Sequence, residues 1–471
     1  MSRLIDLFRN QPSVPHDQLS DEDRKRSMRV ALSTVVFSSI YMKGTMGPAI
    51  VGLFRSLGAT PFWIGMLSAT SGLSLIGQPI GSYLLSRSKS RKKLFLRLTL
   101  TGRVMLWGLV AGAMFLPPGI ATVLVLFVSV LGCRFTGAMG WPSWYSWMSD
   151  LAPEDQRGWF WGTRNMVSNT VGMVAALALN WYLGDDPSME KFVAFFIVIA
   201  ICGMLDIYMH RGIHGVNVAA ENSREDVGEM FRRPFRDRAF LPIVVFSFIF
   251  GFSCSLGSGM MHLMLLEEIN LSYFEIAIYL SGVLGVVNVV ASKYWGRLVD
   301  NLHEGARIVM AVCSVIVAVL PFLWVVTGPR DHLLVIANVI GGGLGWSGYM
   351  IAKMALIAAY SPQEHRPSYA ATNAVVGGIG TMLGALVAGI LAQTFQDVSM
   401  VIGPLYITSL RIPYIFSGFA RMLSLLILPF IRMPDSVPLG VYVHQVLTMN
   451  PFRRGTWVYV RERVRSQNGG K

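Results

Sequence analysis

The chain has 471 residues, of which 53% are hydrophobic and only 14% are charged. A soluble protein carries about a quarter of its residues as charged side chains, so this composition excludes an ordinary soluble domain. The charged residues occur in clusters. Between the clusters lie apolar runs of about 20 residues or more, the length that crosses a bilayer core about 30 Å thick. The composition therefore predicts an all-α integral membrane protein.

The formal net charge of +13 has two interpretations. A basic chain can bind nucleic acid, or its basic residues can gather in the loops on one side of a membrane, as the positive-inside rule describes. The cysteines Cys133, Cys202, Cys254 and Cys313 all lie within apolar runs, without metal-ligand or disulfide spacing. We expect them to be small buried side chains, and we expect no metal and no cofactor.

Twelve apolar runs are expected to span the membrane. In chain order they cover residues 29–53, 61–85, 94–117, 120–148, 159–183, 191–210, 240–265, 272–295, 306–327, 332–359, 367–396 and 405–432. The first run lacks the short core and cleavage site of a signal peptide. The expected organisation is a polar N-terminal segment (1–28), a six-helix bundle (29–210), a polar linker (211–239), a second six-helix bundle (240–432) and a basic tail (433–471).

The loops on the two sides of this arrangement differ in charge. An even number of spans places both termini on one side, and the loops of that side contain Arg87, Lys89, Arg91, Lys92, Lys93, Arg157, Arg297, Arg307 and Arg366. The loops of the other side contain Asp185, Asp186, Glu190, Glu267, Glu268, Asp331 and Asp397. The positive-inside rule then predicts cytoplasmic termini, in a bacterial inner membrane. Because topology explains the charge, we expect no nucleic-acid partner.

Two basic segments also contain aromatic residues. The linker sequence EDVGEMFRRPFRDRAF and the tail sequence NPFRRGTWVYVRERVRS both mix arginine with aromatic side chains. This mixture is typical of a short amphipathic helix on an anionic membrane surface. The alternative for each segment is a solvated tail or linker, and the sequence leaves both interpretations open.

An internal repeat relates the two bundles. The stretch SDLAPEDQRGWFWGTRN (149–165) aligns with AYSPQEHRPSYAATNA (359–374) after a shift of 209 residues. The shift pairs Pro153 with Pro362 and Arg157 with Arg366. A second pair of segments, 81–93 and 296–307, each begins with glycine and ends with a basic residue. Two halves that are similar at matched loops are typical of transporters built from parallel repeats.

These motifs resemble those of the major facilitator superfamily over nearly the whole chain. The second-half loop is similar to the family signature G-x-L-x-D-R-x-G-R-[RK], with Gly296, Leu298, Asp300, Gly305 and Arg307; the first-half copy retains Gly81, Arg87 and Arg91 but lacks the aspartate. The fourth span carries RFTGAMG, similar to a second signature, with glycine at 137 in place of glutamine. The resemblance implies two six-helix bundles around a central cavity, which opens alternately to each side and is lined by the first, fourth, seventh and tenth spans.

Three cations lie within expected spans. Lys43, Arg134 and Lys353 fall on the first, fourth and tenth spans, away from the ends. A charge near the bilayer centre costs about 2.5–3.5 kcal/mol, so such a residue is a candidate functional site. Unpaired cations that face a wet cavity attract anions, which favours an organic, phosphorylated or lipid-like anion as substrate. The alternative is that these cations bind backbone carbonyls or reach the headgroups.

Other charges and rings complete this interpretation. Arg103 and Arg421 lie on the third and twelfth spans, where the resemblance implies a scaffold. No carboxylate lies clearly in mid-membrane, so proton coupling through an acidic residue is not expected, whereas anion exchange or facilitated movement is. Aromatic residues at helical spacing are expected beside the cations as substrate contacts: Trp141, Trp144 and Tyr145 in the fourth span, and Trp346 and Tyr349 in the tenth.

The loop residues suggest a gate. We expect Asp150 to pair with Arg157, Arg87 or Arg91 when the cytoplasmic side is closed, and Asp300 to pair with Arg366 in the other half. Gly81, Gly296 and Arg307 belong to the same loops. Exposed ion pairs contribute only about 0–1 kcal/mol, which is enough to bias two states of similar energy.

Several functions are compatible with these residues. An enzyme is not expected, because no histidine, carboxylate, serine or cysteine cluster occurs at matched depth. The first hypothesis is a secondary transporter, expected to be a monomer whose partners are a small-molecule substrate and membrane lipids. The alternatives are efflux of hydrophobic or drug-like compounds and a membrane receptor or scaffold that transports nothing.

Overall fold

The computed structural model describes residues 10–15, 19–88, 90–153, 156–217, 227–301, 305–362 and 365–431. Ten helices in these ranges are long and apolar enough to cross a membrane. The first two expected spans also correspond to helices, each divided in two. They are α2 (Asp21–Met46) with α3 (Pro48–Ser56), and α4 (Pro61–Leu75) with α5 (Gly77–Ser86). The chain is therefore an all-α integral membrane protein, as the composition predicts.

The N-terminal half begins earlier than the apolar pattern indicates. Helix α2 starts at Asp21 rather than near residue 29, because the Ser20 side chain accepts a hydrogen bond from the Asp23 backbone N–H. Three acidic residues in the first turn add a favourable interaction with the helix dipole. The remaining helices of this half are α6 (Arg91–Phe115), α7 (Ile120–Leu151), α8 (Arg157–Leu183) and α9 (Met189–His210).

The C-terminal half contains shorter segments. It consists of α11 (Leu241–Ser258), α12 (Met261–Glu267), α13 (Tyr273–Ala277), the π-helix η2 (Ile278–Val283), α14 (Leu284–Asn301), α15 (Gly305–Val326), α16 (His332–Tyr360), α17 (Arg366–Thr394), α18 (Ile412–Leu425) and the 3-10 helix η4 (Leu428–Phe430). A capping box between Ser272 and Glu275 begins α13. Segments α13, η2 and α14 form one continuous span over 273–300.

The expected start of the twelfth span near residue 405 is wrong. Strands β3 (Ser399–Ile402) and β4 (Leu405–Thr408) pair antiparallel around the turn residues Gly403 and Pro404. Gly403 has a φ of 58°, a conformation that glycine adopts without steric cost. Helix α18 starts only at Ile412, with Pro413 in its first turn, where proline's missing N–H is not needed.

The basic linker and the N-terminal segment meet at one end of the molecule. Strand β1 (Ser13–Pro15) pairs in parallel with β2 (Gly215–Asn217), which follows α9. Lys92, expected in a loop, is instead buried, and its ammonium group donates to the carbonyls of Gln11, Arg211 and Ile213. Burial lowers the pKa of His214 beside β2. Helix α10 (Val227–Arg236) lies within the expected amphipathic segment, whereas the basic tail lies outside the described residues.

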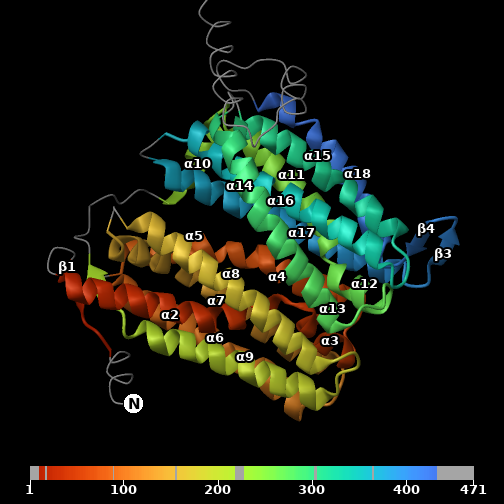
Figure 1. Cartoon of the computed structure of the whole chain (residues 1–471), viewed down its shortest axis with the longest axis horizontal. Helices are drawn as coiled ribbons and strands as arrows, with labels where there is room; N and C mark the ends of the chain where they lie inside the picture. The colour runs from red at the N-terminus through yellow and green to blue at the C-terminus, as the bar shows by residue number, and fades with distance from the viewer. Residues whose placement is uncertain are drawn as a thin grey trace, which may run out of the picture.

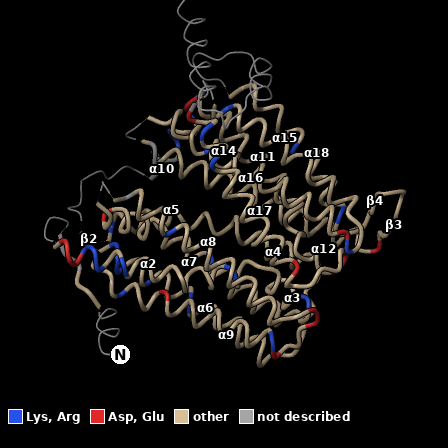
Figure 2. Tube along the Cα trace, viewed as in Figure 1, with Lys and Arg blue, Asp and Glu red and all other residues tan. Residues whose placement is uncertain are grey.

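The two halves meet at the opposite end. We call the end with β1, β2 and α10 the basic end, and the end with α3, α12 and the β3–β4 hairpin the hairpin end. One hydrophobic cluster combines residues of both halves, including Leu53 and Phe192 with Met264 and Tyr273. Two further clusters each belong to a single half. Figure 1 shows the halves approaching each other near α3, α12 and α13. In Figure 2 most charged segments gather toward the two ends.

Close backbone contact and polar bonds join the halves. Helices α4 and α17 cross at Gly65 and Gly389, where a Cβ added to Gly65 would lie 2.5 Å from the Gly389 Cα. Arg55 of α3 donates from Nε and Nη2 to the two carboxylate oxygens of Glu267 of α12, at 2.6 and 3.2 Å. The Ser68 hydroxyl donates to the Gly259 carbonyl at 2.9 Å. The halves are thus closed against each other at the hairpin end.

The glycine crossing predicts an overpacking effect. Gly65→Val places its Cβ against backbone atoms of α17 that cannot rotate away, so we expect a loss of about 1–3 kcal/mol of stability. Gly137→Val is the matched control, because a Cβ at Gly137 meets no atom within 4 Å. Thermal unfolding in detergent measures both variants. Equal melting temperatures for the two variants would contradict the close crossing.

Candidate functional site

Two of the expected substrate cations have no polar partner. Lys43 lies on α2, exposed, with its stem against Gly172 of α8. Lys353 lies on α16, partly buried, with its ammonium 5.9 Å from the Tyr349 ring centroid. Neither ammonium forms a hydrogen bond or ion pair with any residue that the structure describes. Each half thus contributes a span lysine without a polar partner among the described residues: Lys43 on the first span and Lys353 on the tenth.

Arg134 has a different environment. Its guanidinium donates to the Leu67 carbonyl, the Thr70 and Ser71 hydroxyls and the Thr45 carbonyl, at 2.6–3.2 Å. All four acceptors are neutral, and they belong to α2 and α4. This geometry ties α7 to its two neighbours and agrees with the alternative interpretation, in which the cation binds carbonyl groups.

The aromatic residues of the fourth span form a continuous surface with α8. Trp141 and Tyr145 stack at 6.3 Å between centroids, and Tyr145 stacks on Trp161 of α8 at 5.6 Å. Trp144 lies 5.0 Å from Trp141 and is 5% exposed, whereas Trp141 and Tyr145 are about half exposed. We call these four residues the aromatic wall. Gly137, one turn from Trp141, borders open space. Sequence reasoning missed Trp161, because its partners lie on another helix.

The matching set on the tenth span is packed more tightly. Tyr349 is buried, with its ring 4.8 Å from Phe250 of α11, and Trp346 meets Tyr349 edge-on at 5.6 Å. Tyr349 therefore belongs to the hydrophobic core of its own half. Of the expected set, Lys353 and the partly exposed Trp346 remain available to a ligand.

One of the contacts expected among the gate residues is present. Asp150 forms an ion pair with Arg91, within the N-terminal half. Arg87 instead stacks over Tyr83. Gly81 is required for close packing, because an added Cβ would overlap the backbone of Met139, whereas Gly296 borders open space. Asp300 is exposed and Arg307 is buried; the side chains of Arg157 and Arg366 lie outside the described part, and with them the expected Asp300–Arg366 pair.

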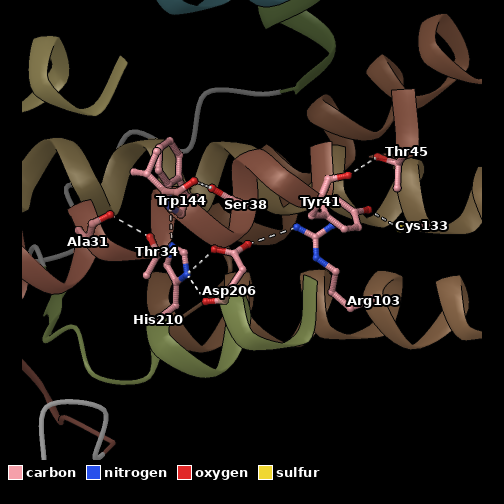
Figure 3. Close-up of polar contacts among 11 residues, drawn as sticks. Ala31, Thr34, Ser38, Tyr41, Thr45, Arg103, Cys133, Trp144, Asp206 and His210 are labelled. Atoms are coloured by element: carbon pink, nitrogen blue, oxygen red, sulfur yellow. Dashed lines mark hydrogen bonds and ion pairs between the residues drawn. The ribbon is translucent and has the colours of Figure 1, made fainter. Parts of the chain in front are cut away.

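A buried polar network inside the N-terminal half was not expected from the sequence. Figure 3 shows it extending across α2, α6, α7 and α9. Arg103 pairs with Asp206 at 3.3 Å, and the Arg103 guanidinium lies 3.4 Å from the Tyr41 ring centroid. The Tyr41 hydroxyl contacts Cys133 Sγ at 2.8 Å. Asp206 looks like a helix-end residue in sequence, yet it is only 3% exposed.

His210 and Arg164 extend this network toward the aromatic wall. His210 Nδ1 lies 2.7 Å from the Asp206 carbonyl, and Trp144 Nε1 donates to His210 Nε2 at 3.1 Å. Arg164 of α8 lies 4.5 Å from the Trp144 ring centroid and donates to the Ala31 carbonyl. Within the described ranges, no group of three or more histidine, cysteine or acidic side chains is arranged to hold a metal ion.

Comparison with known proteins identifies this architecture. The family model described as Major Facilitator Superfamily matches residues 32–352 and 286–453. A search of curated proteins gave no match. Among solved structures, a variant of the nucleoside transporter NupG superposes with a TM-score of 0.69 at 12% identity, covering 86% of this chain and 100% of that chain.

Two other solved structures give similar superpositions. A bacterial homologue of the lysosomal transporter Spinster, in an inward-facing and unoccupied conformation, has a TM-score of 0.63 at 14% identity and covers 88% of this chain and 100% of its own. A peptide transporter POT in complex with sulfate has a TM-score of 0.63 at 13% identity, covering 88% and 94%. At these identities the likeness concerns the fold.

The buried pair Arg103–Asp206 predicts a large effect of breaking one partner alone. Asp206→Asn leaves a buried guanidinium without its counter-charge, and we expect it to cost about 3–5 kcal/mol of stability. The double variant Arg103→Met with Asp206→Leu removes both charges and should recover most of this loss. Unfolding in detergent measures the three proteins. A single variant as stable as the parent would show that the pair does not stabilise the bundle.

Proposed function

Because the chain belongs to the major facilitator superfamily of membrane transporters, we propose that it is a secondary active or facilitative transporter that carries a small organic or phosphorylated anion by alternating access. The observation that carries the substrate class is the pair of unpaired lysines, Lys43 and Lys353, one in each half. A cation within a membrane span is costly when it has no counter-charge. An anion bound between the halves would offset this cost for both lysines together.

We propose the orientation from charge. The basic end faces the cytoplasm of a bacterial cell, with both termini on that side, because cytoplasmic loops carry an excess of lysine and arginine. With this orientation, closure at the hairpin end and separate hydrophobic clusters at the basic end describe an inward-facing state. Alternation then requires the hairpin end to open while the basic end closes.

The lysines give the first test. Lys43→Gln and Lys353→Gln should each reduce uptake of the transported anion by proteoliposomes at least about tenfold, since a charge-assisted contact with the anion is worth more than about 1.4 kcal/mol. Lys293→Gln, which removes an exposed lysine of α14, is the matched control and should leave uptake unchanged. The panel contains monocarboxylates, dicarboxylates, sugar phosphates and lysophospholipids.

Other results of the same panel would replace the proposal. The exposed rings of Trp141 and Tyr145 favour a second candidate, efflux of hydrophobic or drug-like compounds. Movement of a hydrophobic cation, with no anion moved, would support that candidate. If nothing is moved and both lysine variants preserve the cellular phenotype, a receptor or scaffold role replaces transport.

We propose that the Arg55–Glu267 pair is the latch of the hairpin end, whereas the Arg91–Asp150 pair strengthens the basic end of one half. Both Arg55 and Glu267 are more than one-third exposed, so their bond contributes only about 0–1 kcal/mol. That energy changes the ratio of two nearly equal states by up to about fivefold. A latch of this strength closes the hairpin end without trapping the transporter there.

A charge exchange tests the latch. Arg55→Glu should raise the rate at which a cysteine at position 68, between the halves, reacts with a water-soluble thiol reagent added from the hairpin side. The reagent reaches that position only when this end opens. Adding Glu267→Arg should restore the parental rate, because it recreates an ion pair with exchanged signs. If the double variant reacts as fast as Arg55→Glu, the two side chains do not act as a pair.

A further inference from the structure

The bond between Trp144 and His210 fixes the protonation state of a buried histidine. An indole N–H only donates hydrogen bonds, so His210 Nε2 must accept. The two atoms are 3.1 Å apart. His210 is therefore neutral, with its proton on Nδ1, which donates to the Asp206 carbonyl (Figure 3). The imidazole is 2% exposed, and the bond from Trp144 can form only while its Nε2 carries no proton.

A second proton on His210 would go to Nε2 and would leave the Nδ1–H bond to the Asp206 carbonyl in place. Nε2 would become a donor facing the indole donor, so the bond to Trp144 would break. The other side of the ring is prepared for a charged imidazolium, because Asp206 Oδ1 lies 3.4 Å from Nδ1 and accepts no hydrogen bond in this state. One proton from water is taken up, one hydrogen bond is lost, and an ion pair with the carboxylate is strengthened.

The displaced indole belongs to the aromatic wall. Trp144 lies 5.0 Å from Trp141 and 5.7 Å from Trp161, measured between ring centroids. Both neighbours lie on the surface that adjoins the open space at Gly137. A change in the Trp144 position therefore alters the shape of this surface, and a ligand that stacks on it affects the Trp144–His210 bond in return.

The surrounding charges determine the sign of this coupling. Burial itself opposes a charge on the imidazole. The charged groups that act on His210 are Asp206 on its own helix, Arg103 of α6 and Arg164 of α8, and in the described part of α7 the neutral rings of Trp144 and Trp147 lie beside it. Arg164 has no carboxylate partner among the described residues. The group already carries one excess positive charge, so a further proton becomes more favourable when a transported anion passes beside Arg164. Proton and anion then increase each other's affinity, because linkage is reciprocal.

We propose that His210 is a proton-binding site and that Trp144 and Arg164 couple its protonation to anion binding at the aromatic wall, so that the anion travels together with a proton. This inference rests on the proposed transport of an anion. It replaces the expectation that proton coupling is absent for want of a mid-membrane carboxylate: here a histidine near the basic end accepts the proton, and Asp206 stabilises it.

The proton site is tested without any substrate. The protein is labelled with 5-fluorotryptophan in lipid nanodiscs, and the Trp144 fluorine resonance is assigned by its loss in Trp144→Phe. We expect this resonance to shift in a single transition as the pH is lowered. The transition should disappear in His210→Gln, whose amide oxygen keeps accepting from the indole. It should persist in His214→Gln, which changes another buried histidine of this half. A resonance that does not titrate, or that titrates equally in His210→Gln, overturns the proposal.

A variant of Arg164 tests the effect of its charge on His210. Arg164→Gln removes a cation that has no carboxylate partner among the described residues and should move the midpoint of the transition to higher pH, because a like charge nearby disfavours the imidazolium. Arg97→Gln, on the exposed face of α6, is the matched control and should leave the midpoint unchanged. An unchanged midpoint in Arg164→Gln overturns the coupling. This variant also tests the site if His210→Gln does not fold.

Transport separates this inference from the function on which it rests. With the anion that gives the largest uptake in the panel, the wild type should acidify the vesicle lumen as the anion enters, as reported by a trapped pH dye. His210→Gln should retain exchange of that anion across the membrane and lose the pH change. Uptake without acidification in the wild type overturns the coupling and leaves anion transport intact, whereas a panel without any transported anion overturns the proposed function.

Discussion

The absence of water in a bilayer core governs the polar residues of this chain. A charge or backbone group buried there must find its partner within the protein, because no solvent can supply one. The scaffold arginines follow this rule. Arg134 and Arg421 donate to carbonyls of neighbouring helices, Arg103 pairs with Asp206, and the fully buried Arg411 pairs with Glu268 while donating to two carbonyls. Each bond fixes the distance between helices, so these arginines determine how the helices pack. Lys43 and Lys353 are exceptions to this rule, because neither ammonium has a polar partner among the described residues.

The same rule explains the uneven contact between the halves. At the hairpin end the adjacent residues Glu267 and Glu268 form different ion pairs. Glu267 binds Arg55 of the N-terminal half, and Glu268 binds Arg411 of its own half. The first pair is exposed and weak, and the second is buried, where breaking one partner is costly. Rocking of the halves can therefore break the contact between them while each half keeps its internal bonds. At the basic end, Lys92 and the Arg91–Asp150 pair again act within one half.

Sequence reasoning predicted most of the fold, because the length and composition of the apolar runs are sufficient to locate spans. It placed Lys43, Arg134 and Lys353 on spans but could not separate them, since their difference lies in the partners that other helices supply. Arg134 donates to the Thr70 hydroxyl, whereas the Lys353 ammonium has no hydrogen-bond partner among the described residues. Helix α2 began earlier than predicted because a cap at Ser20 outweighs the polarity of the first turns. The β3–β4 hairpin was missed because its residues are as apolar as those of a membrane-spanning helix. Only Gly403 and Pro404 indicate a turn.

Sequence reasoning did not find the polar network of Figure 3, because its residues come together only in the folded helices. Asp206 and His210 are one turn apart on α9, a spacing that in sequence indicates only a polar helix end. Their role depends on contacts with Trp144 of α7 and Arg103 of α6, which the sequence spacing does not reveal. A buried network with an odd charge is costly for a structural device, since an apolar replacement of similar shape would stabilise the bundle equally well or better. The bond that joins this network to the aromatic wall gives the proposed proton site a use that an apolar core would not provide, because protonation of His210 would change the shape of the wall and a nearby anion would stabilise the proton.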